Sequence, residues 1–380
     1  MATLSPTLES TPVLRRKRRI GLAVLLACLG LFGLDALLFR TNLYPSILEP
    51  ASSAGYFEMV LRRERQAQQE KGDRLVVTLG NSRFGYSPKI IDHLPVKAAY
   101  EFRSAGIAGT NAQVWYYMLR DLDPTARRYR AIVIGVDDYE DEDRAFQPDD
   151  DITALHYAIS SVRWSDTIGL ARSFHSRHVQ WEAFRSAALK GIAYQSDILA
   201  FLTHPQKRLA NVELYRGGFA GWTYDYVESP RSMEGLRIDW STMQATFPAG
   251  FTQEQRDTVS FLAHPPDPQN GRLAAYRRTW FGKIIDRYRG SRTKIVFIRL
   301  ARGPIPRPEN LTRTRSASIR EFASRPNVIL ADEHAFDSLE RPELYKDCLH
   351  LNREGVARFS RMLSDEITRI LGASDRRPAQ

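Results

Sequence analysis

One serine and one Asp-x-x-His pair have the residue types and the spacing of a nucleophilic site. The apolar run Leu75–Leu79 ends in "GNS", whose serine is Ser82, and "KDCLHLN" near the C-terminus holds Asp347 and His350. A serine hydroxyl is a poor nucleophile at neutral pH, so it needs a base within hydrogen-bond reach and a carboxylate to orient that base. The three residues together predict nucleophilic catalysis. The alternative is that Ser82 and His350 merely cap helices and Asp347 is a solvated loop residue.

Strand-like and helix-like patterns alternate through most of the chain. The strands and helices that they predict must position these residues. Apolar runs predict strands at 75–79, 96–102, 131–135, 294–300 and 327–331, and helical patterns fall at 88–93, 111–122, 272–289, 316–323 and 353–371. Such alternation implies right-handed crossovers and a parallel sheet covered on both faces. We therefore predict an α/β, doubly wound (flavodoxin-like) five-stranded parallel sheet. Ligands of such sheets bind beyond the carboxyl ends of the strands, where Ser82 lies.

The connection between the third and fourth predicted strands is too long for a loop. Residues 139–271 separate these strands, with helical patterns at 152–168 and 178–192. We interpret this segment as a large, mostly helical cap inserted into a domain of residues 74–371, which is followed by a short tail, 372–380. We expect the cap to cover the mouth of the site.

The N-terminal part reads as a membrane anchor. Ile20–Phe39 is twenty mostly apolar residues, enough to cross a bilayer as a helix, and the basic run Arg15–Arg19 precedes it. The positive-inside rule then places residues 1–19 in the cytoplasm and residues 41–380 outside. A cleaved signal peptide is the alternative. Residues 40–73 are expected to form a stalk and a linker helix.

Composition excludes some classes of function. The net charge is +10, but no basic stripe interleaved with aromatic residues is present, so nucleic-acid binding is not expected. Cys348 is the only cysteine after the anchor, so no disulfide forms within that region. The acidic runs at 137–144 and 149–151, and the pair His175 and His178, lack the spacing of a metal site, and we predict no metal and no cofactor.

Four short blocks, in order, resemble the SGNH (GDSL-like) hydrolase superfamily. They are "GNS" at 80–82, "SAGIAG" at 104–109, "IGVDD" at 134–138 and "DCLHLN" at 347–352. The resemblance implies that Ser82, Asp347 and His350 are catalytic, and that backbone N–H groups of Ser82 and Gly106 form an oxyanion hole. His334 is a rival base, although it does not precede the last helix as the family pattern requires.

One position departs from the family pattern. The third block usually carries an asparagine that donates to the oxyanion, and Asp137 stands there instead. Losing one such donor can cost about 3 kcal/mol, and an ionised carboxylate would repel the oxyanion. Either another donor replaces it, with Arg83 and Asn111 as candidate substrate-binding residues, or Asp137 is protonated, or activity is weak or absent.

A single membrane span joined to an SGNH-like outer domain is similar to proteins that esterify bacterial cell-surface polymers. The resemblance implies a membrane-anchored, extracytoplasmic (periplasmic or extracellular) serine esterase or O-acyltransferase that acts on acylated polysaccharide through an acyl-Ser82 intermediate. Its expected partners are the polysaccharide or its acyl donor, the membrane through residues 20–39, and a membrane-bound acyl-transfer protein. The alternative is a catalytically inactive SGNH-like glycan-binding or scaffold component of a polysaccharide export or modification complex, and a lipid-directed esterase is a weaker third.

Overall fold

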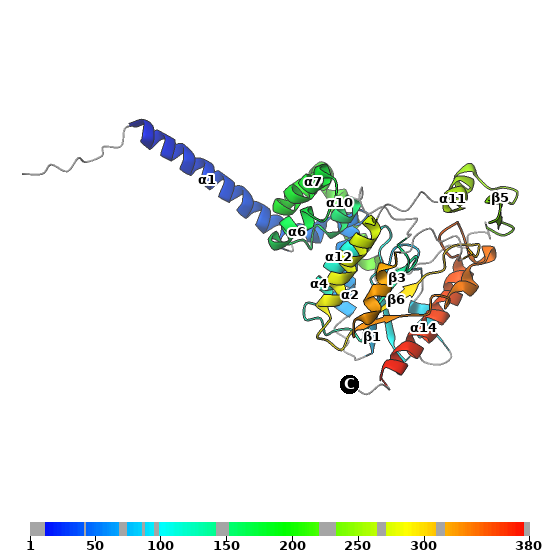
Figure 1. Ribbon diagram of the computed structural model, residues 1–380. Coiled ribbons are helices and arrows are strands. Elements are labelled where there is room, and N and C mark those ends of the chain that lie inside the picture. Colours follow the sequence, from blue (N-terminus) through cyan, green and yellow to red (C-terminus); the bar gives the residue numbers. More distant parts are fainter. Residues whose placement is uncertain are drawn as a thin grey trace, which may run out of the picture.

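An α/β domain follows a long N-terminal helix (Figure 1). The computed structural model describes residues 12–41, 43–67, 74–85, 88–94, 99–141, 152–219, 233–263, 271–308 and 316–375. The helix α1 (Pro12–Phe39) projects from one side of the domain. Within it, Arg19–Phe39 is long and apolar enough to cross a membrane.

A five-stranded sheet, all of it parallel, forms the centre of the domain. Its strands are β1 (Leu75–Leu79), β2 (Glu101–Ser104), β3 (Ala131–Val136), β6 (Lys294–Arg299) and β7 (Val328–Leu330). They lie in the order β2-β1-β3-β6-β7. Every residue of β1 and β3 is buried, as their unbroken apolar runs require of strands covered on both faces. The predicted five-stranded parallel sheet is confirmed, although β2 starts later than the predicted residue 96.

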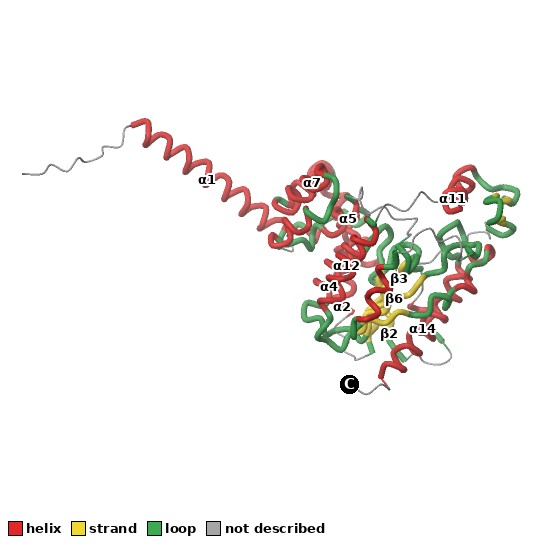
Figure 2. The backbone as a smooth tube through the Cα atoms, in the orientation of Figure 1, coloured by secondary structure: helices red, strands yellow, loops and turns green. Residues whose placement is uncertain are grey.

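Helices cover the two faces of this sheet (Figure 2). Alternate strand residues point to opposite faces, so Val77 and Val76 belong to different hydrophobic clusters. The Val77 cluster is completed by α2 (Ser53–Ala67), α4 (Ala112–Leu122) and α12 (Arg272–Arg287). The Val76 cluster is completed by α3 (Pro88–Asp92) and α14 (Arg353–Asp375). A shorter helix, α13 (Ser318–Glu321), precedes β7.

The chain between β3 and β6 forms two groups of elements. The first is helical: α5 (Thr153–Ala158), α6 (Thr167–Ala171), α7 (Arg177–Ala188), α8 (Lys190–Ala193), α9 (Gln195–Thr203) and α10 (Pro205–Phe219). The second comprises the antiparallel pair β4 (Arg237–Asp239) and β5 (Gln244–Thr246), followed by α11 (Gln253–Ala263). Figure 1 shows the first group beside the end of α1 and the second group on the other side of the domain.

The helix expected over residues 152–168 is broken into shorter pieces. Arg163 has extended backbone angles between α5 and the 3-10 helix η2 (Trp164–Asp166). Its backbone N–H donates to the Asp166 carboxylate at 2.7 Å, so a side chain replaces the helical acceptor there.

The segment after α1 packs against the helical group instead of extending as a free stalk. Tyr44 and Leu48 are buried on either side of the short helix η1 (Pro45–Ile47). The Tyr44 hydroxyl donates to the Asp197 carboxylate at 2.6 Å. Arg208 on α10 donates to both Asp197 and Glu49 at 2.9 Å, which ties the segment to α9 and α10.

Candidate active site

A tight turn after β1 positions Ser82 at the carboxyl end of the sheet. The Phe84 N–H donates to the Asn81 carbonyl at 3.1 Å, and the Arg83 N–H donates to the Asn81 side-chain oxygen at 2.9 Å. A Cβ atom at Gly80 would lie 2.5 Å from Phe84, so only glycine fits under this turn. The turn therefore leaves Ser82 half-buried while Phe84 returns to the core, where it is 6% exposed.

A braced loop before α14 holds Asp347 and His350. Tyr345 and Leu351 form an isolated bridge, and the Lys346 N–H donates to the His350 carbonyl at 3.0 Å. Inside the loop, one Asp347 carboxylate oxygen accepts the backbone N–H groups of Leu349 and His350, each at 2.8 Å. The Asp-x-x-His spacing thus closes a turn in which the aspartate faces the histidine ring.

The structure brings Ser82, His350 and Asp347 together. His350 Nε2 lies 2.8 Å from the Ser82 hydroxyl, and His350 Nδ1 lies 2.9 Å from both Asp347 carboxylate oxygens. Burial raises the pKa of Asp347, but hydrogen bonds from the His350 ring and from the Leu349 N–H outweigh it and hold the pKa below its usual value. An ionised Asp347 fixes the tautomer with hydrogen on Nδ1, so Nε2 is free to accept the serine proton.

Asp137 is paired with a cation. It follows the end of β3, and its carboxylate lies 2.7 Å from the Arg83 guanidinium, with the two side chains only 9% and 8% exposed. Arg83 also donates to the Arg302 carbonyl at 2.9 Å. The guanidinium is therefore directed at Asp137 and at the loop after β6, and it offsets the carboxylate charge that stands where an asparagine is expected.

Asn111 and Gly106 lie in the adjoining loop between β2 and α4. Asn111 is the N-cap of α4, where its side-chain oxygen accepts the Val114 N–H at 3.4 Å. It lines a hollow of about 430 Å³ that Asn81 and Asp137 also line. At Gly106, a Cβ atom would lie 3.1 Å from the Gly80 carbonyl oxygen, so a glycine lets this loop approach the turn that carries Ser82.

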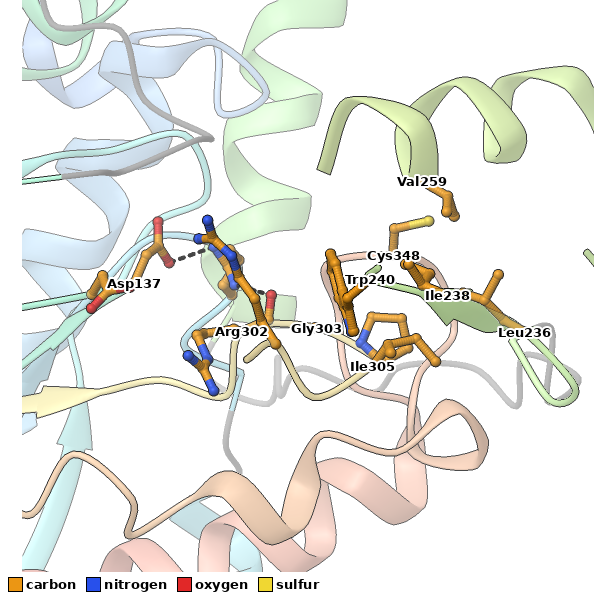
Figure 3. A pocket seen from close by; sticks show the side chains of 13 residues that line it. Asp137, Leu236, Ile238, Trp240, Val259, Arg302, Gly303, Ile305 and Cys348 are labelled. Atoms are coloured by element: carbon orange, nitrogen blue, oxygen red, sulfur yellow. Dashed lines mark hydrogen bonds and ion pairs between the residues drawn. The ribbon is translucent and has the colours of Figure 1, made fainter. Parts of the chain in front are cut away.

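A larger hollow, of about 670 Å³, is also lined by the Arg83–Asp137 pair (Figure 3). Its polar lining includes Asp138 and Arg302. Its apolar lining comes from the segment between β3 and β6, from the loop after β6 and from the Asp347 loop: Leu236, Ile238, Trp240, Val259, Ile305 and Cys348. The Trp240 ring N–H donates to the Pro306 carbonyl at 2.9 Å and fastens the β4–β5 hairpin to the loop after β6. No local sequence signal identified Trp240 as a lining residue.

The second aspartate of "DD" at 137–138 has an unusual protonation. Burial, together with a hydrogen bond to Glu140, raises the pKa of Asp138 to about 7. The same hydrogen bond from Asp138 lowers the pKa of Glu140 to about 2. The pair therefore shares one proton, which Asp138 holds in mildly acidic solution.

The other polar candidates lie elsewhere. His334, the rival base, follows β7, and its Nδ1 lies 2.7 Å from Asp337, with the histidine side chain 58% exposed. Within the described ranges, no three His, Cys, Asp or Glu side chains gather as metal ligands. The acidic run at 149–151 lies outside the described residues.

No protein-family model matches this chain, and no curated protein matches it in sequence. The chemistry of the site therefore has to be argued from its geometry.

Proposed function

We propose that this protein is a membrane-anchored serine esterase or O-acyltransferase of the SGNH (GDSL-like) kind, acting outside the cytoplasm on acylated cell-surface polysaccharide. The observation that carries the proposal is the relay from Ser82 through His350 to Asp347, with contacts of 2.8 and 2.9 Å. A serine, a histidine and an ionised carboxylate in this order make up an activated nucleophile.

The topology supports this assignment. The strand order β2-β1-β3-β6-β7 corresponds to the flavodoxin-like order 2-1-3-4-5, which reverses direction between β1 and β3. Ser82 follows β1 and Asp137 follows β3, so both lie at the point where doubly wound sheets bind their ligands. In this view, residues 139–271 are an insertion whose β4–β5 and α11 part lines the hollow next to the site.

The reaction proceeds in two halves. Ser82 Oγ attacks the acyl carbonyl carbon while its proton passes to His350 Nε2, and this proton then leaves with the departing alcohol as the ester bond breaks. In the second half a water molecule or a sugar hydroxyl attacks the acyl-serine and gives its proton to His350, which returns it to Ser82. Water as acceptor makes the protein an esterase, and a sugar hydroxyl makes it a transferase.

The oxyanion is stabilised without Asp137. The backbone N–H groups of Ser82 and Gly106 are two donors, and the amide of Asn111, which lines the hollow beside Asn81 and Asp137, is the third. Arg83 neutralises Asp137, which removes most of the repulsion that a free carboxylate would exert.

The hollow beside the site suits an acyl ester of a polar polymer. Its apolar part, at Ile238, Trp240 and Val259, suits an acyl chain, and its polar part includes Arg302, whose guanidinium is held by Glu340 at 3.0 Å. A membrane-bound acyl-transfer protein would be the donor in the transferase reaction.

A fluorophosphonate probe tests the proposal on the full chain in detergent. Wild-type protein should be labelled, and labelling should be lost in Ser82→Ala and in His350→Ala. His334→Ala is the matched control, because His334 and Asp337 have the same i,i+3 spacing as the proposed pair, while the His334 side chain is 58% exposed and that of His350 is 22% exposed. This variant should label normally. Labelling that survives Ser82→Ala refutes the nucleophile.

The Asp137 carboxylate favours one second candidate, an inactive SGNH-like domain that binds glycan or scaffolds an export complex. The absence of labelling in well-folded wild-type protein, with retained glycan binding, would support that candidate over the enzyme.

A further inference from the structure

The end of α1 is fixed to the helical group by buried polar contacts. The Asp35 carboxylate accepts the backbone N–H groups of Lys190 and Gly191, at 3.2 and 2.8 Å. One turn later, Arg40 donates to the carbonyl groups of Ala187 and Ala188 at the end of α7. These contacts hold α1 in a defined position relative to α7 and α8.

The docking reaches into the end of the apolar stretch of α1. The side chains of residues 20–34 are all exposed, whereas Asp35 and Phe39 are buried against the domain. The stretch that is able to cross a membrane, Arg19–Phe39, therefore ends where the helical group begins. A bilayer crossed by α1 would have one of its surfaces close to this group.

The helical group exposes an unusual amount of apolar surface. Outside α1 and Leu43, every exposed large apolar side chain in the described part of the chain lies between residues 164 and 215. We call six of these the anchor-side surface: Trp164, Ile168, Trp181, Phe184, Leu199 and Leu202, which are 40–69% exposed. Exposed apolar side chains gathered on neighbouring helices in this way mark contact with a protein or a membrane.

This surface lies beside the base of α1. Arg40, at the end of α1, stacks 4.4 Å from the Trp164 ring, and the Trp164 ring N–H donates to Ala188 at 3.1 Å. On α7, Trp181 and Phe184 stack at 5.7 Å with their rings 16° apart. Figure 1 shows α6 and α7 next to the end of α1, so a bilayer crossed by α1 would meet these helices first.

We propose that the anchor-side surface is embedded in the interfacial layer of the bilayer that α1 crosses. Its tryptophan and phenylalanine rings occupy the level where aromatic side chains are favoured, next to the docked end of α1. The inference rests on α1 crossing a membrane and not on the chemistry of Ser82.

Quenching by brominated lipids tests the proposal on the full chain. Wild-type protein is reconstituted in phosphatidylcholine–phosphatidylglycerol vesicles with and without lipids brominated on the acyl chain. Bromine should lower the tryptophan fluorescence, and Trp181→Phe should remove roughly half of that loss, since Trp181 and Trp164 are the tryptophans placed at the interface. Trp240→Phe, which changes a tryptophan at the distant hollow, should leave the loss unchanged.

An undiminished loss in Trp181→Phe overturns the proposal, as does wild-type protein whose fluorescence is insensitive to bromine. The alternative is that the anchor-side surface binds a second copy of the chain. Sedimentation in detergent that shows a dimer, dispersed by Phe184→Arg, would assign the surface to self-association and likewise overturn membrane contact. Because Trp181 is 59% exposed, its replacement should not disturb folding.

Discussion

Removing Arg83 should destabilise the protein far more than removing an arginine from a surface ion pair. Arg83 and Asp137 are 2.7 Å apart and nearly buried, so at an effective dielectric constant of about 20 they attract one another by about 6 kcal/mol. Withdrawing each charge from water costs several kcal/mol, so the pair roughly balances, but one charge alone does not. We therefore expect Arg83→Met to lower the free energy of unfolding by about 3–5 kcal/mol.

The assay is urea unfolding of the full chain in detergent micelles, followed by intrinsic fluorescence. Arg289→Met is the matched control, because Arg289 pairs with Asp286 while both side chains are more than half exposed, and it should cost less than about 1 kcal/mol. Asp137→Asn and the double variant Arg83→Met/Asp137→Asn complete a double-mutant cycle. The double variant should be more stable than the sum of the single effects predicts, by about 1–3 kcal/mol.

Two results would refute this reasoning. One is an Arg83→Met cost equal to that of Arg289→Met, and the other is strict additivity in the cycle. The salt dependence gives an internal check. At high ionic strength the cost of Arg83→Met should persist, because salt screens a nearly buried pair far less than an exposed one such as Arg289–Asp286.

Three further predictions concern the site and the anchor. Ser82→Ala and His350→Ala should each abolish ester turnover and the double variant should lose little more, since the two act as a unit; multiplicative losses would contradict this. The raised pKa of Asp138 makes the free energy of unfolding fall as the pH rises through about 7. Asp138→Asn should therefore make the free energy of unfolding less dependent on pH between pH 5 and 8. The same pH dependence in this variant and in the wild type, measured by urea unfolding, would exclude the raised pKa. A reporter fused after Gln380 should be active only if it functions outside the cytoplasm, and activity of a strictly cytoplasmic reporter there would reverse the orientation.

The sequence determined the sheet and the three residues of the relay. Unbroken apolar runs such as Ala131–Val136 can only be strands buried on both faces, and the helical patterns between them require parallel pairing. Ser82 could be placed because the carboxyl ends of such strands share one edge of the sheet. The apolar run before Arg40 likewise identified a helix able to cross a membrane, because length and composition suffice for that.

The tertiary structure alone decided what surrounds these residues. The pairing of Arg83 with Asp137, the proton shared by Asp138 and Glu140, and the place of Trp240 in the hollow all depend on side chains that meet across the fold. The sequence predicts a stalk after α1, because the prolines and polar residues of that segment carry no packing signal. In the structure, Tyr44 and Leu48 of this segment are buried, and Tyr44 bonds to Asp197 on α9. Local patterns report the periodicity of one segment, whereas charge neutralisation and burial depend on which distant segments it contacts, and those contacts are fixed only when the chain has folded.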